Sequence, residues 1–242
     1  MSGMISGIEF AKRCHWVFDP RYPDMPQFSA GNARTGDWVF VNGDYLEEFL
    51  SRIPVFQLKM FTVIVHNSDR TFGQRELERT LRVATKIYAI NTTVQHPQLK
   101  TIPIGFVDRQ LPYLASFIPP GPETERSIEI YGNFTPQTNQ QARGVCAFVF
   151  HGNPKVVMSA WKPVPEYYAD LCKSKFVLCP EGTGPDTHRV YESLLCGATP
   201  VVLRNSLSHL YETLPVCIID RWEDPFYVPK FTGFPLGVDK YL

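Results

Sequence analysis

One segment, residues 175–203, constrains the fold of this chain more than any other. It reads KFVLCPEGTGPDTHRVYESLLCGATPVVL and opens with a short apolar run, Phe176–Cys179, which suits a buried strand. Two glycines and two prolines in the next six residues exclude regular structure there. Apolar residues at helical spacing follow up to Leu195, Gly197 ends that helix, and Pro200–Leu203 begins a second apolar run. The segment therefore predicts a strand, loop, helix, strand unit of a parallel sheet.

The polar residues of this segment indicate an anionic ligand. The loop before the helix follows a strand, at the carboxyl end where open parallel sheets bind ligands. Asp186 or Thr187 is the expected N-cap, and the free N–H groups of the first turn suit a phosphate. Arg189 can bind a diphosphate in bidentate fashion, and Glu192 is placed to accept hydrogen bonds from a ribose. The alternative is an ordinary surface ion pair between Arg189 and Glu192, but the glycine-rich loop favours the ligand.

The same stretch resembles the donor-binding segment of exostosin-like glycosyltransferases. The resemblance covers about thirty residues and rests on Ser174-Lys175-Phe176, Pro180-Glu181-Gly182, Arg189, Glu192 and the run from Gly197 to Val201. Fucosyltransferase-like families have a similar segment, but they place a Lys beside the Glu, and this chain does not. The resemblance implies α/β architecture of the GT-B kind, with two Rossmann-like domains facing across a cleft. It also implies transfer of a sugar from a nucleotide-diphosphate sugar to a hydroxyl of a glycan or glycoconjugate.

Composition excludes some other classes of protein. Lys+Arg 24 balances Asp+Glu 24 in 242 residues, so no global charge attracts nucleic acid. No apolar run has the length of a membrane span, and the first residues lack a signal-peptide core, so we expect a cytoplasmic chain. The six cysteines are scattered without a C-x-x-C pair, which favours reduced and mostly buried thiols.

Strand and helix patterns alternate along the whole chain. The run 117–125 has three prolines and a glycine in four consecutive positions and is the expected linker, so we place one domain at 1–118 and the donor domain at 119–242. In the first domain we expect strands at 15–18, 38–41, 61–65, 86–90 and 101–105, with helices at 45–52 and 74–84. In the second we expect strands at 127–131, 147–150, 176–179, 201–203 and 216–219, with helices at 164–172 and 207–214, besides the helix before Gly197.

Further polar residues follow predicted strands. His66 and Asp69 come after the run 61–65, and they serve either a site or only a capped turn. Thr138, Asn139 and Arg143 follow the strand at 127–131 and match a turn of related enzymes; Thr138 is equally well explained as a helix N-cap. The candidate donor-binding residues are Gly182, Thr183, Gly184, Asp186, Thr187, His188, Arg189, Glu192, Thr138, Asn139 and Arg143.

Glycosyl transfer needs a stabilised diphosphate leaving group and, for inversion, a general base. The chain has no Asp-x-Asp motif, so we expect Arg189 and a helix N-terminus to replace a metal, with no other cofactor. The base is expected in the opposite domain, with Asp69 as first choice and His66 as second; Glu181 in the donor loop is third. Inversion is implied by the resemblance alone.

Two other classes of function are alternatives to a transferase. A non-catalytic nucleotide or nucleotide-sugar binding module would keep Arg189 and Glu192 but would need no base. An oxidoreductase of the Rossmann type would need a G-x-G-x-x-G motif, which neither half contains.

Overall fold

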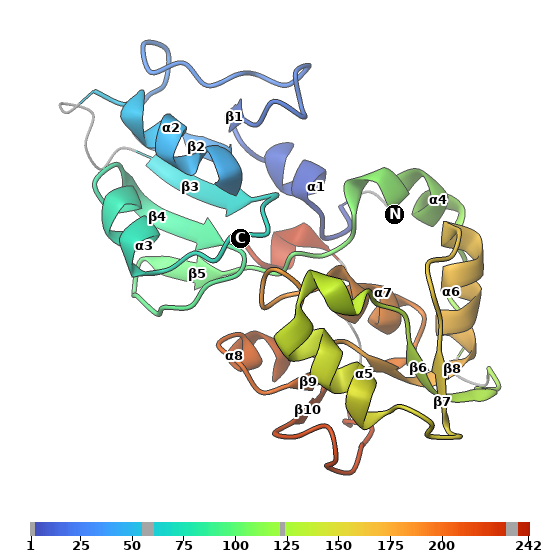
Figure 1. The fold of residues 1–242 in the computed structure, drawn as a ribbon. Coiled ribbons are helices and arrows are strands. Elements are labelled where there is room, and N and C mark those ends of the chain that lie inside the picture. Colours follow the sequence, from blue (N-terminus) through green and yellow to red (C-terminus); the bar gives the residue numbers. More distant parts are fainter. Residues whose placement is uncertain (1–2, 55–60, 122–123, 231–236) are drawn as a thin grey trace. The chain divides into compact units, whose positions relative to one another are not determined.

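The computed structural model describes residues 3–54, 61–121, 124–230 and 237–242 (Figure 1). Part of the predicted linker, 122–123, and part of the tail, 231–236, lie outside these ranges. The chain forms two compact units, Met1–Ile104 with Leu236–Leu242, and Gly105–Pro235. No helix in the described part of the chain is long and apolar enough to cross a membrane.

The first unit is built on a parallel five-stranded sheet in the order β1-β2-β3-β4-β5. Its central strand β3 is buried along its whole length, as expected for an apolar run with a strand on each side. Its strands are β1 (Trp16–Phe18), β2 (Trp38–Asn42), β3 (Phe61–His66), β4 (Ala84–Ala89) and β5 (Leu99–Thr101). Its helices are α1 (Gly7–Ala11), α2 (Leu46–Ser51) and α3 (Gln74–Thr80), with short 3₁₀ turns at Gly43–Tyr45 and Val238–Lys240.

The last residues of the chain pack on this first unit. The Tyr88 hydroxyl donates to the carbonyl oxygen of Leu242 at 2.7 Å, and Arg13 pairs with Asp239 at 2.5 Å. A β-bridge joins Met4 to Gly237. The described end of the tail therefore belongs to the first unit, although the chain reaches it after building the second.

The second unit contains another parallel five-stranded sheet, in the order β10-β9-β8-β6-β7. Its strands are β6 (Ile128–Gly132), β7 (Val156–Met158), β8 (Ser174–Leu178), β9 (Thr199–Leu203) and β10 (Cys217–Ile219). Its α-helices are α4 (Leu111–Ser116), α5 (Val145–Val149), α6 (Val164–Lys173), α7 (His188–Leu195) and α8 (Ser208–Tyr211). Shorter helical turns lie at Asp108–Gln110, Pro136–Thr138 and, in π form, Gln140–Gly144. The predicted α/β class is thus confirmed, with two parallel five-stranded sheets that are consistent with a Rossmann-like fold.

The predicted strand at 147–150 is wrong, because these residues belong to helix α5 and its C-cap. In a strand, Cys146, Phe148 and Phe150 would share one face. Cys146 and Phe150 are buried, whereas the Phe148 side chain between them is 82% exposed, as helical spacing requires. The strand that pairs with β6 on this side is β7, which the sequence did not predict.

Several predicted boundaries also shift. The strand expected at 101–105 is instead β5, Leu99–Thr101, because Pro103 has no N–H to continue the ladder. The helix expected at 74–84 ends at Thr80, since Ala84 already pairs with Phe61 at the start of β4. The helix expected at 207–214 is only α8.

The domain boundary expected after residue 118 lies inside the second unit, which begins at Gly105. Residues 105–118 include α4, and its aromatic residues explain this division. The ring centroids of Tyr113 and Phe117 lie 5.5 and 5.3 Å from that of Tyr168 on α6. The Tyr168 hydroxyl also donates to Gln110 at 3.0 Å.

Candidate functional site

The order of strands in the second unit singles out one place for a ligand. In the sheet, β6 has β7 as its neighbour on one side and β8 as its neighbour on the other. The chain therefore goes from β6 to β7 and then crosses to the opposite side of β6 to form β8. Open parallel sheets bind ligands at such a reversal, beyond the carboxyl ends of the strands. In the first unit, the described strands follow chain order without a reversal. We call the residues beyond β6 and β8, 133–144 and 179–192, the switch-point site.

The two loops of the switch-point site hold one another through side chains predicted from the sequence. Asn139 Nδ2 donates to the carbonyl oxygen of Gly182 at 2.8 Å, and Arg143 Nε donates to that of Glu181 at 3.1 Å. A Cβ atom on Gly182 would lie only 2.7 Å from Arg143 Nη2, so this close approach needs glycine. Asn139 also accepts from Ala142 N at 3.0 Å, so Asn139, and not the exposed Thr138, caps the helical turn that follows.

Arg189 projects from the first turn of α7, and its charge is not matched by an acid. Its Nε and Nη1 atoms are buried and have no hydrogen-bond partner in the described part of the chain. The guanidinium carbon lies 5.9 Å from the centre of the Phe134 ring, which follows β6. Buried polar groups are nearly always hydrogen-bonded, so an unmatched guanidinium at a sheet switch point is the strongest sign of an anion site in the chain.

Glu192 lies one turn deeper in α7 and is only 4% exposed. Its Oε2 accepts a hydrogen bond from the hydroxyl of Tyr167 on α6 at 2.7 Å. Burial, and then the negative charge of Glu192, raise the pKa of Tyr167 well above its ordinary value, so this phenol remains a donor. No described ion pair joins Glu192 to Arg189, so the surface pair considered from the sequence is not formed.

Asp186 is also held by tyrosines. Its carboxylate, 4% exposed, accepts from Tyr191 Oη at 2.7 Å and from Tyr211 Oη at 2.8 Å. It further accepts from the backbone N–H of Thr187 at 2.8 Å. Thr187 is the N-cap residue of α7 but makes no side-chain capping bond. Asp186 thus fixes the loop where it enters the helix.

The other predicted loop residues lie around this point. His188 Nδ1 lies 2.6 Å from the carbonyl oxygen of Gly105. Thr183 is exposed at the tip of the loop, and Gly184 is buried. Glu181 Oε1 accepts from Asn205 Nδ2 at 2.7 Å; Asn205 follows the carboxyl end of β9. The structure therefore gathers the predicted donor residues at the ends of β6 and β8, with Thr138 and Thr183 exposed.

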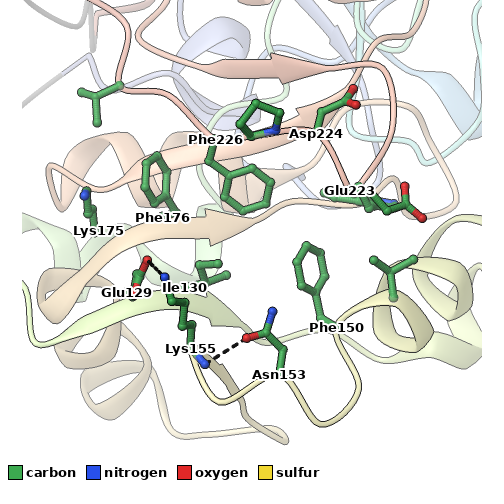
Figure 2. Close-up of a pocket in the computed structure, with 14 residues that line it drawn as sticks. Glu129, Ile130, Phe150, Asn153, Lys155, Lys175, Phe176, Glu223, Asp224 and Phe226 are labelled. Carbon is green, nitrogen blue, oxygen red and sulfur yellow. Dashed lines mark hydrogen bonds and ion pairs between the residues drawn. The ribbon is translucent and has the colours of Figure 1, made fainter.

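Two pockets of the second unit differ in position along the sheet. One, of about 390 Å³, is lined by Asn139, Pro180, Glu181 and Asn205 and lies beyond β8 and β9, at their carboxyl ends. The larger one, of about 740 Å³, is drawn in Figure 2 and is lined by Glu129 and Lys175, near the starts of β6 and β8. Because ligands bind at carboxyl ends, we assign the smaller pocket to the switch-point site despite its size.

In the first unit, the two predicted bases differ in environment. Asp69 is exposed in the loop after β3, and none of the described residues bonds to it. His66, the last residue of β3, is 1% exposed and packs against Phe10. Its Nε2 lies 3.3 Å from the carbonyl oxygen of Pro103, and its Nδ1 lies 3.0 Å from Asn67 Oδ1. The N-cap of the next helix is Gly73, so Asp69 is not a capping residue.

Sequence reasoning missed several residues of the switch-point site: Phe134, Tyr167, Tyr191, Asn205 and Tyr211. Asn205 follows a predicted strand, so the rule that sites form at the carboxyl ends of strands would have found it. The tyrosines lie on helices at positions that pattern alone assigns to the core. Among the described residues, no group of three or more His, Cys, Asp or Glu is placed to hold a metal ion.

Comparison with known proteins finds plant glycosyltransferases. The chain is 35% identical over 120 residues to a probable glucuronosyltransferase of Oryza sativa subsp. japonica, covering 46% of this chain and 27% of that protein. Another probable glucuronosyltransferase of the same plant is 38% identical over 113 residues, covering 43% and 26%. A probable beta-1,4-xylosyltransferase of Arabidopsis thaliana is 32% identical over 120 residues, covering 46% and 27%.

Each matched region is thus less than half of this chain and about a quarter of the relative's length. No family model matches the chain.

Proposed function

We propose that this chain is a glycosyltransferase that moves a sugar from a nucleotide-diphosphate sugar to a hydroxyl of a glycan or glycoconjugate. The observation that carries the proposal is that two buried guanidinium nitrogens of Arg189, at the sheet switch point, have no hydrogen-bond partner among the described residues. The named activities of the plant relatives support the reaction class. The GT-B architecture, in which different Rossmann-like units bind donor and acceptor, is part of the proposal.

The donor diphosphate is assigned to Arg189 and the first turn of α7. A diphosphate would supply the acceptor atoms that Arg189 Nε and Nη1 lack in the protein, through charge-assisted hydrogen bonds. The uncapped N-terminus of α7 adds N–H donors and a favourable dipole. Glu192 is assigned to the ribose through its second carboxylate oxygen, because Tyr167 occupies only Oε2.

The contacts of Asn139 and Arg143 with the loop after β8 position this donor site. Asn139 and Arg143 bind backbone carbonyls of the donor loop, so both have positioning roles and their side chains fix residues 181 and 182. Neutralisation of the leaving group by Arg189 requires no metal ion, and the proposed transfer is independent of one. Chelation with EDTA should leave the rate of transfer unchanged. Loss of activity on chelation, with recovery on adding Mn²⁺, would contradict metal independence.

The proposed reaction inverts the anomeric centre, with Asp69 as general base. Asp69 is preferred because its exposed carboxylate has no partner to displace in the described ranges, whereas His66 is buried with both ring nitrogens in contact with neighbours. Glu181 is third, since Asn205 already binds one of its oxygens. If His66 is the base instead, His66→Gln will retain donor binding and lose transfer while Asp69→Asn transfers normally.

The reaction is tested with the full chain and a panel of UDP- and GDP-sugars, including glucuronic acid and xylose donors because of the relatives' names. Slow hydrolysis of one donor, and its acceleration by a glycan acceptor, is the expected result. The anomeric configuration of the product, read by NMR, tests inversion. If a donor binds but no hydrolysis or transfer occurs with any acceptor, the chain is the non-catalytic nucleotide-sugar module.

The site assignment is tested by calorimetry with UDP and GDP. Arg189→Ala should weaken binding by about 30-fold or more, because a desolvated charged contact is worth roughly 2–5 kcal/mol. Arg221→Ala is the matched control, since Arg221 is exposed and pairs only locally with Asp224. An equal loss of nucleotide affinity in both variants, or no loss in either, would contradict the assignment of the diphosphate to this site.

A further inference from the structure

Two cysteines lie at the ends of neighbouring helices. Cys172 is in the last turn of α6, and Cys196 is the C-cap residue of α7. Both are free thiols, with Cys172 partly exposed and Cys196 buried, and their side chains share a hydrogen bond. Their positions, 24 apart in the sequence, bracket β8, the donor loop and α7.

A single arginine holds the two backbones together. Arg126 Nη1 donates to the carbonyl oxygen of Cys172 at 2.5 Å and to that of Cys196 at 2.8 Å. The fit is close, because a Cβ atom on the following residue, Gly197, would lie 2.6 Å from Arg126 Nη2. One guanidinium nitrogen therefore binds the backbone of both cysteines and holds the end of α6 beside the end of α7.

The two thiols differ in reactivity. The hydrogen bond from Cys196, helped by the nearby charge of Arg126, holds the pKa of the Cys172 thiol below its usual value. The same contact with Cys172, and then burial, raise the pKa of Cys196. Cys172 thus has the exposure and thiolate character of an attacking cysteine, and Cys196 is placed as its resolving partner.

We propose that Cys172 and Cys196 form a redox-sensitive dithiol, which closes into a disulfide when a small-molecule disulfide such as oxidised glutathione is the oxidant. The Cys172 thiolate attacks one sulfur of glutathione disulfide, so a mixed disulfide forms and one glutathione thiolate leaves. Cys196 then loses its proton, attacks the Cys172 sulfur and releases the second glutathione. The two cysteines are oxidised, and one glutathione disulfide is reduced to two thiols.

Trypsin makes the test unambiguous, because it places each relevant cysteine on its own peptide. Cleavage after Lys and Arg, except before Pro, gives peptides 156–173 with Cys172, 176–189 with Cys179 and 190–204 with Cys196. The reduced full chain is incubated with oxidised glutathione, blocked with N-ethylmaleimide and digested for mass spectrometry. Peptides 156–173 and 190–204 should appear joined by a disulfide.

Matched variants distinguish this pair from general oxidation. Cys172→Ser and Cys196→Ser should each abolish the linked peptide, whereas Cys179→Ser should retain it, because burial raises the pKa of the Cys179 thiol to about 12. A link from Cys172 to any other cysteine, or a persistent glutathione adduct on Cys172 with Cys196 blocked by maleimide, would overturn the proposal.

Alkylation of the wild-type chain provides a test that does not depend on variants that fold. With limiting iodoacetamide, Cys172 should react at least about tenfold faster than Cys179, which is buried. Equal or slower labelling of Cys172 would remove the attacking thiol and overturn the proposal.

Discussion

Replacing Arg189 with methionine should stabilise the ligand-free protein and remove most of its response to nucleotide. The two buried donors without partners, Nε and Nη1, each leave a desolvation cost of about 1–3 kcal/mol in the folded state. Methionine has a similar length and no donors. Against this relief stands the loss of the contact with the Phe134 ring at 5.9 Å, worth about 0.5–1 kcal/mol. The net expectation is a gain of roughly 1–5 kcal/mol in the free energy of unfolding.

Urea unfolding, with and without UDP or GDP, measures both effects. Nucleotide at about 100 times the wild-type Kd should stabilise the wild-type protein by about 2.7 kcal/mol, and the Arg189→Met protein by less than about 1 kcal/mol. Arg189→Lys serves as the control, because it keeps the positive charge but loses the planar arrangement of donors; it should fall between the two. Its nucleotide response should be reduced but present.

One result would refute this reasoning directly. If Arg189→Met lowers the free energy of unfolding by more than about 1 kcal/mol without nucleotide, the guanidinium is a structural partner in the folded protein. Its two buried nitrogens would then be satisfied in solution, and the argument for an anion site would lose its main support.

Three other substitutions test neighbouring parts of the structure. Tyr167→Phe removes the only described hydrogen bond to the Glu192 carboxylate, so the freed carboxylate should turn toward Arg189 and weaken UDP binding about tenfold, as read by calorimetry; unchanged affinity would contradict this. Asp69→Asn should leave donor binding intact and slow transfer by about a hundredfold or more, as expected when a positioned base is lost; near-normal transfer would exclude it. Asp19→Asn should reduce the loss in free energy of unfolding that the protein shows at acid pH. Burial raises the pKa of Asp19, but hydrogen bonds outweigh this and hold the pKa below its usual value. The wild type should therefore lose stability as the pH falls from about 4 through the folded-state pKa. Equal urea midpoints of the two proteins across that range would contradict this.

Strand and helix periodicity was sufficient to predict most of the fold. β3 and β8 are apolar runs of strand length between turn residues, and a parallel sheet buries such runs on both faces. The same rule failed for residues 147–150, because a short apolar run does not distinguish a strand from one face of a helix. β7 escaped prediction because it is an edge strand of three residues, with Val157 and Met158 exposed and little hydrophobic signal.

The candidate site was predictable where its residues follow a strand or open a helix. Arg189 was found in this way, whereas Asn139 and Arg143 were identified through the resemblance to related enzymes. The structure places all three beyond the ends of β6 and β8. The sequence did not show which side chains donate hydrogen bonds to the carboxylates of Asp186 and Glu192. Tyr167 and Tyr211 come from other helices, and contacts between distant segments leave no periodic pattern in a single sequence.

Those tyrosine contacts explain how a buried cation can stay available to a ligand. An acid near an arginine ordinarily forms an ion pair with it, and such a pair would compete with an incoming phosphate. Here the two acids nearest the start of α7 are held by phenol hydroxyls, Glu192 by Tyr167 and Asp186 by Tyr191 and Tyr211. Neutral donors stabilise the carboxylates without consuming the positive charge of Arg189. Among the described residues, Arg189 therefore has no acid partner at this helix N-terminus, and this arrangement selects for an anionic ligand over a neutral sugar.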